Sequence, residues 1–173
     1  MRKKISHNSV FQILSAKEKL LVWFRRNKRN LPFRVKKDPY RIWVSEVMLQ
    51  QTRMIVMLPL YEKFIQRFPN IKSLSNAKDK EVLFFWRGLG YYSRAYNLRK
   101  GAKFVMDSFD GEMPKDLESL LKIPGVGPYT ARAISSIAFG KKHAVLDGNV
   151  KRVIARIYQF EKPINVPSSL KYL

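Results

Sequence analysis

The sequence predicts an all-helical fold, and three observations support this prediction. Between residues 150 and 158, apolar residues stand at positions i, i+3, i+4, i+7 and i+8, which is the spacing of one helix face. Asp38-Pro39 has the order of a helix N-cap followed by a first helical residue, where the missing proline N–H is not needed. Strand signals are weak, because the apolar run from His143 to Leu146 is too short to imply a sheet.

The first helix is expected to begin at a capping box. Ser15 would be the N-cap and Glu18 would reach back to it, just before an apolar stretch over residues 20–24. A basic cluster over residues 25–29 follows this stretch, and Leu31-Pro32 then breaks the helical pattern.

Turn residues and caps set the bounds of the remaining helices. Pro59 predicts a kink or a late start in the helix that contains it. Asn76 is expected to cap a helix that Gly88-Leu89-Gly90 ends, and Pro128 opens a helix that stops at Gly140. We therefore expect helices from Pro39, over about 53–68, from Asn76 to about 87, and over about 93–109, 116–122, 128–139 and 150–158.

Charge points to a polyanionic partner. Lysine and arginine outnumber acidic residues by 34 to 13, which gives a formal net charge of +21. Solubility does not require so large an excess of one sign, and such a field attracts polyanions, of which nucleic acid is the commonest inside cells. A lysine-rich bias of the whole proteome is the alternative. Charge therefore favours nucleic acid and says nothing about chemistry.

Composition argues against several other classes of protein. The chain has 173 residues, 46% of them hydrophobic, which suits one ordinary domain or one with a small appendage. No run of 18 apolar residues occurs, so no membrane span is expected. The basic N-terminus, residues 1–4, lacks the apolar run of a signal peptide, which predicts a cytoplasmic location. With no cysteine and two histidines, the chain is expected to hold no disulfide and no metal, although carboxylates could hold magnesium.

A glycine-containing hairpin lies between two helical patterns, at Ile123-Pro124-Gly125-Val126-Gly127. Glycines allow positive φ and close backbone approach. The N–H groups of Gly125 and Gly127, together with the start of the next helix, would then face an anion such as a phosphate. The alternative is a plain helix–helix turn that happens to contain glycine.

The order of elements after the hairpin carries a first resemblance. Nineteen residues separate Gly127 from Asp147, which stands in Leu146-Asp147-Gly148-Asn149-Val150 before a helix. Here the sequence resembles the helix–hairpin–helix DNA glycosylase superfamily. The resemblance implies that the hairpin (Gly125, Val126 and Gly127) grips a phosphate and that Asp147 faces the damaged nucleotide. Asp147 can also be the N-cap of the last helix, and both roles can hold together.

Glu46 is the second candidate carboxylate. Its neighbours Trp43, Val44, Val47 and Met48 are apolar, so a core-facing Glu46 would be poorly solvated. A carboxyl group shielded from water keeps its proton to higher pH and can then act as an acid. Taken by itself, a glutamate such as Glu46 is more often an exposed helix residue than a core-facing one.

The surroundings of Glu46 make the resemblance more specific. The whole series of motifs resembles the adenine DNA glycosylase family, which removes adenine mispaired with 8-oxoguanine or guanine, and the resemblance covers roughly residues 21–158. The motifs occur in order at Leu31-Pro32-Phe33-Arg34, Asp38-Pro39-Tyr40, Trp43-Val44-Ser45-Glu46-Val47-Met48-Leu49-Gln50-Gln51-Thr52 and Gly88-Leu89-Gly90-Tyr91-Tyr92-Ser93-Arg94, before the hairpin and Asp147.

Tyr129 separates two branches of the superfamily. In the endonuclease III-like glycosylase/lyases, the resemblance places a lysine nucleophile two residues after the second hairpin glycine, and this chain has Tyr129 there. A phenol cannot form a Schiff base. The sequence therefore predicts a monofunctional glycosylase that hydrolyses the N-glycosidic bond without a lyase step.

The resemblance also implies residue roles. Adenine would be flipped out of the duplex, protonated Glu46 would donate to the purine, and ionised Asp147 would stabilise the cationic sugar. Double-stranded DNA with an adenine mismatch is thus the expected partner of a monomeric enzyme. By the same resemblance, Tyr129 and Asn149 orient the reacting groups, Gln51 and Tyr91 insert into the DNA stack, and Arg29, Leu31 and Arg34 line the adenine pocket. Surface charge for the arginines and core packing for Leu31 and Tyr91 are the alternatives.

The chain departs from the family in two ways. Phe33 stands where the family usually has tryptophan, which keeps an aromatic ring and loses the indole N–H. The family also continues further, with helices that complete a second lobe, four cysteines that hold a four-iron–four-sulfur cluster, and a domain that reads 8-oxoguanine. We therefore expect a six-helix barrel domain over 31–150 with the hairpin unit at about 116–140, flanked by 1–30 and 151–173 as parts of an incomplete second lobe.

Two alternatives to an adenine glycosylase stay open at this point. The chain could be a DNA-binding remnant that grips phosphates without cutting a bond. It could also be a helix–hairpin–helix glycosylase with another base preference. Release of adenine from a duplex in which it faces 8-oxoguanine separates adenine excision from both.

Overall fold

The computed structural model describes residues 7–161, 163 and 164, and this part of the chain folds into ten α-helices without a strand. The all-helical prediction is confirmed. The chain divides into two compact units, Met1–Val35 and Lys36–Leu173. The predicted division into lobes at residues 30 and 150 remains a prediction. No helix in the described residues has the length and apolar character needed to cross a membrane.

The first unit holds α1 (His7–Asn27) and α2 (Pro32–Val35). The expected capping box is wrong, because α1 begins at His7 and Ser15 lies inside it. Residues 7–14 contain neither proline nor glycine, so nothing in the chain stops the helix from extending back through Ser15. The apolar stretch over 20–24 is exposed on this helix.

Pro32 starts a helix instead of only ending one. Proline fits a first helical position, and the amide of Arg34 donates to the carbonyl of Leu31 at 2.8 Å. Phe33 in α2 is fully buried, so the position at which the family has tryptophan keeps a core role here. The Arg34 guanidinium lies 5.8 Å from the centre of the Phe33 ring.

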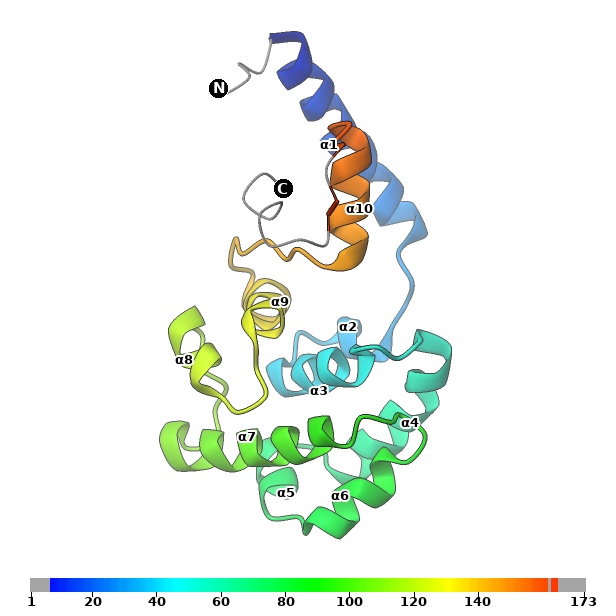
Figure 1. Cartoon of the computed structure of the whole chain (residues 1–173). Coiled ribbons are helices and arrows are strands. Elements are labelled where there is room, and N and C mark those ends of the chain that lie inside the picture. Colours follow the sequence, from blue (N-terminus) through cyan, green and yellow to red (C-terminus); the bar gives the residue numbers. More distant parts are fainter. Residues whose placement is uncertain (1–6, 162, 165–173) are drawn as a thin grey trace. The chain divides into compact units, whose positions relative to one another are not determined.

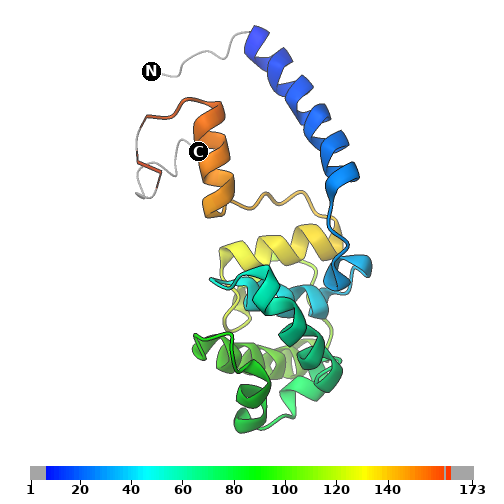
Figure 2. The same cartoon turned by 90° about the vertical axis from the view of Figure 1, so that its right-hand side faces the viewer.

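In the second unit, α3 lies between α9 and α7, and α5 and α6 pack against the other side of α7 (Figure 1). The view turned by 90° shows the same order (Figure 2). The helices are α3 (Pro39–Leu49), α4 (Met54–Arg67), α5 (Ile71–Ser75), α6 (Asp79–Trp86), α7 (Ser93–Phe109), α8 (Leu117–Lys122), α9 (Pro128–Phe139) and α10 (Gly148–Ile157).

Most predicted helix bounds in this unit are confirmed. Asp38 caps α3 by accepting from the Arg41 amide at 3.0 Å, and Asp116 caps α8 by accepting from Ser119 at 2.8 Å. The bounds of α7 and α9 agree with the predicted ranges. α4 begins at Met54 with Pro59 in its interior, so the alternative of a late start is wrong.

Asn76 does not cap α6. It is the C-cap of α5, a short helix that the sequence did not predict, while Lys78 precedes α6 without a side-chain cap. The sequence does contain a start signal for α5, because Asn70 and Ser73 form a reciprocal capping box at its N-terminus. The second residue of such a box is usually glutamate or glutamine, so a box with serine is harder to recognise in the sequence.

Gly101 lets the backbone of α7 approach α3 and the hairpin closely. A Cβ atom at this position would lie 2.8 Å from Trp43 Cζ2, 2.9 Å from Ile123 Cγ2 and 2.9 Å from the carbonyl oxygen of Pro124. Trp43 is fully buried and Ile123 nearly so. The three segments that carry the candidate site therefore form one tightly packed block.

Candidate active site

Glu46 lies in the most buried helix of the second unit. Eight of the eleven residues of α3 are buried, and Glu46 is 4% exposed. The alternative of an exposed helix position is therefore wrong. A carboxyl group removed from water to this degree must be hydrogen-bonded, paired or protonated, because an unpaired charge there would be very costly.

Asp147 has the opposite environment. It is the half-buried N-cap of α10, where Oδ1 accepts from the Val150 amide at 2.7 Å and Oδ2 accepts from Asn149 Nδ2 at 3.2 Å. Asn149 Oδ1 in turn accepts from Arg152 Nη2. The N-cap interpretation is confirmed, and Asn149 holds the carboxylate from one side. The contacts of Asp147 are thus local, and a joint action with Glu46 on one substrate remains a prediction.

The hairpin between α8 and α9 contains a tight turn. The Val126 amide donates to the carbonyl of Ile123 at 3.0 Å, and Gly125 has φ +79°. Proline followed by a glycine with positive φ is the sequence of a type II turn. A Cβ at Gly125 would lie 2.7 Å from Asn97 Cβ, so this position needs glycine for both conformation and space.

Gly127 needs glycine for neither reason. It is the N-cap of α9 with φ −83°, so it does not use the positive φ that glycine allows, because a helix N-cap has extended backbone. A Cβ there would meet no atom within 4 Å. Gly127 is exposed, and the open space above it is free for a ligand to approach the backbone.

Tyr129 lies in the first turn of α9 and is 40% exposed. The next residue, Thr130, is buried, and its Oγ1 accepts from Gln50 Nε2 at 3.4 Å. This bond joins the start of α9 to the end of α3, so the position of Tyr129 is fixed relative to the helix that carries Glu46.

Gln51 and Tyr91, the predicted DNA-inserting residues, share an uncommon backbone conformation. Gln51 has φ +56° and Tyr91 has φ +45°, and both side chains are exposed. Residues other than glycine seldom adopt positive φ, and such positions concentrate at functional sites. Core packing is therefore wrong as the explanation for Tyr91, which is 63% exposed.

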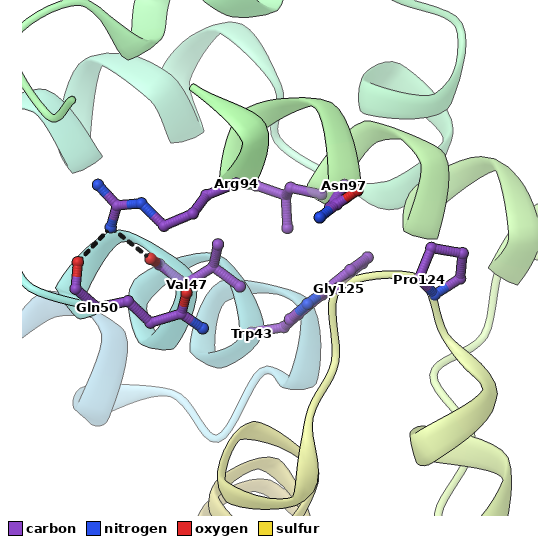
Figure 3. Close-up of a pocket in the computed structure, with 8 residues that line it drawn as sticks. Trp43, Val47, Gln50, Arg94, Asn97, Pro124 and Gly125 are labelled. Atoms are coloured by element: carbon purple, nitrogen blue, oxygen red, sulfur yellow. Dashed lines mark hydrogen bonds between the residues drawn. The ribbon is translucent and has the colours of Figure 1, made fainter. Parts of the chain in front are cut away.

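Arg94 is a site candidate that the sequence motif contained but to which it assigned no role. Its guanidinium reaches the end of α3, and Figure 3 shows it bonded to the carbonyls of Gln50 and Val47. Desolvation lowers the pKa of this guanidinium, and the nearby Tyr91 opposes that effect. The motif that could have revealed it is Tyr-Tyr-Ser-Arg, in which an arginine directly follows the exposed tyrosines.

A small cavity lies between α3, α7 and the hairpin, lined in part by Trp43, Gln50, Arg94 and Gly125 (Figure 3). Its volume of about 40 Å³ exceeds the roughly 15 Å³ that a water molecule needs and is far below the size of a ligand pocket. A purine therefore does not fit it. Two buried donors, Trp43 Nε1 and Arg94 Nε, belong to residues that line it and have no partner in the described part of the chain.

The remaining predicted residues lie in the first unit. Arg29 and Arg34 are exposed and Leu31 is half-buried, so core packing explains Leu31 only in part. Their relation to Glu46 stays a prediction. Within the residues that the structure describes, no three acidic or histidine side chains gather as a metal site. A cluster held by cysteine thiolates does not fit the residues of this chain, because it has none.

Comparison with known proteins assigns the family. Residues 44–171 match the family described as HhH-GPD superfamily base excision DNA repair protein. The chain belongs to this superfamily. The matched range includes Glu46, the hairpin and Asp147, and the resemblance seen in the sequence is confirmed.

Two adenine DNA glycosylases are similar to this chain in sequence. The adenine DNA glycosylase of Buchnera aphidicola subsp. Baizongia pistaciae is 45% identical over 140 residues, which is 80% of this chain and 40% of that protein. The human adenine DNA glycosylase is 42% identical over 157 residues, which is 86% of this chain and 29% of that protein. This chain therefore spans less than half the length of these curated relatives.

Solved structures share the fold. A thermostable thymine-DNA glycosylase superposes with a TM-score of 0.75 at 30% identity, over 79% of this chain and 64% of that one. Endonuclease III in a non-covalent complex with DNA superposes with a TM-score of 0.76 at 23% identity, over 88% of this chain and 72% of that one. At 23% identity the second likeness shows the fold alone.

Proposed function

We propose that this chain carries the catalytic part of an adenine DNA glycosylase, which hydrolyses the N-glycosidic bond of adenine mispaired with 8-oxoguanine or guanine. The observation that carries the proposal is the burial of Glu46 in α3, inside the segment that resembles adenine DNA glycosylases at 45% and 42% identity. Removal of a purine is aided by an acid that is shielded from water, and burial gives Glu46 such an environment. We propose a monomer that acts on DNA in the cytoplasm.

Duplex DNA binds to a surface of strong positive charge. The net charge of +21 supplies the attraction, and the exposed Gly125 and Gly127 let a backbone phosphate approach the hairpin closely. The start of α9 adds the positive end of a helix dipole at the same place. Binding of this kind weakens by about 0.9 log units per phosphate contacted for each tenfold rise in salt concentration.

The target adenine leaves the base stack before any bond breaks. A base inside a duplex cannot reach a buried acid, so the nucleotide must rotate out. Gln51 and Tyr91 are exposed and project from backbone that is held in an uncommon conformation. They fill the space that the flipped base vacates, which keeps the base from returning.

Glu46 is the general acid. Protonation of a ring nitrogen of adenine, N7 in our proposal, turns the base into a neutral leaving group, and the electrons of the C1′–N9 bond move to the base. The burial of Glu46 favours the protonated carboxyl that this step consumes.

Asp147 is the charge stabiliser. The sugar becomes cationic as the base departs, and an ionised carboxylate beside C1′ lowers the energy of that state. The bond from Asn149 and the amide of Val150 hold the carboxylate in one orientation. Water adds to C1′ and releases one proton, and the products are free adenine and an abasic site. Tyr129, at the start of α9, helps to orient these groups.

The decisive experiment measures base release under single-turnover conditions with protein in excess. The substrate is a duplex with one adenine opposite 8-oxoguanine, and the matched control has the same adenine opposite thymine. We expect abasic sites in the first duplex and few in the second. A folded chain that binds both duplexes and releases adenine from neither would show a DNA-binding remnant. Release of thymine from a guanine:thymine duplex would show a glycosylase that prefers thymine to adenine.

A second measurement tests the absence of a lyase step. Because Tyr129 has no amine, sodium borohydride should trap little covalent protein–DNA complex during base release. Tyr129→Lys is the positive control, since it restores an amine at the position of the superfamily's lyases. Efficient trapping by the unchanged chain would mean that another lysine attacks C1′ and that the enzyme is bifunctional.

A further inference from the structure

We propose that Arg94 is a positioning residue that holds the backbones of Gln51 and Tyr91 in their left-handed conformations, and so fixes both DNA-inserting side chains at once. The DNA part of this inference rests on the proposed function. The conformational part does not, because it concerns the free protein.

The first half of the contact lies at the end of α3. Nη1 of Arg94 donates to the carbonyl oxygens of Val47 at 2.9 Å, Met48 at 3.1 Å and Gln50 at 2.5 Å. The last carbonyls of a helix lack donors within the helix, and a cation there also interacts favourably with the helix dipole. Arg94 therefore supplies the C-terminal cap of α3.

This cap explains why Gln51 can have positive φ. A helix that ends with a left-handed residue usually has glycine there, and α3 has Gln51 with φ +56° directly after its C-cap Gln50. The side chain of Gln51 is exposed and cannot fix the backbone by burial. The bonds from Arg94 to the preceding carbonyls do so.

The second half of the contact lies in the loop before α7. Nη2 of Arg94 donates to the carbonyl oxygens of Leu89 at 2.9 Å and Gly90 at 3.1 Å, directly before Tyr91. The guanidinium carbon lies 5.7 Å from the centre of the Tyr91 ring, within the range of a cation–π contact. Nη2 also reaches Thr52 Oγ1 at 3.3 Å, so one nitrogen joins the residues that flank both exposed positions.

Only arginine has the geometry for this task. Its planar fork presents donors in two directions, and the two terminal nitrogens of Arg94 bind carbonyls from two separate segments. A lysine ammonium is a single point with three donors and cannot span the same carbonyls. Arg94→Lys keeps the charge and removes the bridge.

Arg99 gives a matched control on the same helix. It is five residues from Arg94, and it also binds a loop carbonyl through Nε, that of Ala77, and pairs with Asp79 at 3.0 Å. Ala77 lies between α5 and α6 and Asp79 is the first residue of α6, so neither partner belongs to the segments that carry Gln51 and Tyr91. Arg99→Lys therefore reproduces the general cost of losing a half-buried arginine fork without touching the proposed bridge.

The test in the free protein uses NMR relaxation of backbone amides. In the unchanged chain and in Arg99→Lys, we expect Gln51 and Tyr91 to have order parameters near the rigid value of about 0.85. In Arg94→Lys both should fall below about 0.6, the flexible range, while amides in α7 and α9 keep their values. Equal order parameters at the two positions in Arg94→Lys and Arg99→Lys would overturn the inference.

A measurement on the unchanged chain covers the case in which Arg94→Lys fails to fold. If Nη1 and Nη2 of Arg94 bind separate segments, rotation of its guanidinium is blocked and its two terminal nitrogens give separate resonances. The exposed Arg29 serves as the reference with an averaged signal. An averaged signal from Arg94 would contradict the bridge.

An experiment with DNA tests the positioning role of Arg94 in base release and separates its failure from failure of the proposed function. On the adenine:8-oxoguanine duplex at saturating protein, Arg94→Lys should lower base release about 10- to 100-fold, the loss expected from misplaced positioning groups. Arg99→Lys should stay within about threefold. Unchanged release in Arg94→Lys overturns the positioning role, whereas no release by any variant overturns the proposed function and leaves the NMR result to decide on Arg94.

Discussion

α3 and the start of α10 hold the two candidate carboxylates in contrasting ways. α3 is buried on almost every side, with eight of eleven residues inside the core, and Glu46 is among them. α10 has one buried residue, Ala155, and exposes Val153 and Ile157 in the part of the chain that the structure describes. Core packing therefore fixes the position of Glu46, whereas local hydrogen bonds at the N-terminus of α10 fix that of Asp147.

This difference suits two different tasks. A proton donor benefits from a site that excludes water, because desolvation favours the neutral acid. A carboxylate that must stay ionised benefits from fixed hydrogen bonds, and Asp147 accepts two, from Val150 and Asn149. Two acidic residues thus acquire opposite roles from their surroundings, as carboxylate pairs do in sugar hydrolysis.

The largest expected effect separates the cap role of Asp147 from its catalytic role. Asparagine is as good an N-cap as aspartate, so Asp147→Asn should leave the melting temperature within a degree or two. It removes the negative charge, and base release in a single turnover should fall by about 10²–10³-fold. Asp147→Ala is the comparison variant and should lose both stability and rate. A rate for Asp147→Asn within a few-fold of the unchanged chain would reduce Asp147 to a cap.

A smaller effect tests the tight packing between the hairpin and α7. Gly125→Ala adds a Cβ that would lie 2.7 Å from Asn97 Cβ, at a residue with φ +79°. Backbone strain and overpacking together should lower the free energy of unfolding by about 2–4 kcal/mol, measured by denaturant titration. An unchanged midpoint would mean that the hairpin can move away from α7, and that the block around α3 is looser than its contacts indicate.

The smallest effect on stability belongs to Gly127→Ala. Its φ of −83° suits any residue and its Cβ would meet no atom within 4 Å, so only the poorer N-cap preference of alanine should act, and the free energy of unfolding should fall by about 0.5–1 kcal/mol. If a phosphate approaches this backbone, the methyl group should weaken binding to duplex DNA about tenfold in fluorescence anisotropy titrations. DNA affinity equal to that of the unchanged chain would remove Gly127 from the interface.

Local signals in the sequence predicted much of the fold. Asp38 and Asp147 are N-caps as expected, because side-chain capping depends on residues close in the chain. The predictions that α1 begins at Ser15 and that Asn76 caps α6 were wrong. Both side chains can cap a helix, but Ser15 lies inside α1 and Asn76 ends α5. A residue that can cap a helix does so only where tertiary packing ends one.

The candidate site was predictable in part. Residue types marked Glu46 and the hairpin, but the burial of Glu46 depends on α4, α7 and α9 packing around α3, which no local pattern contains. The bonds of Arg94 join segments more than 40 residues apart in the chain. The partners of these hydrogen bonds depend on the fold, so the sequence showed an arginine in a motif but could not show what it binds.

The account depends most on the acid role of Glu46, and one substitution tests it directly. Glu46→Gln preserves size and hydrogen-bonding capacity and removes the transferable proton. With protein in excess over an adenine:8-oxoguanine duplex, and with folding checked by circular dichroism, base release should fall by at least about 10²-fold while DNA affinity is unchanged. Release by Glu46→Gln within a few-fold of the unchanged chain would contradict the assignment of Glu46 as the proton donor.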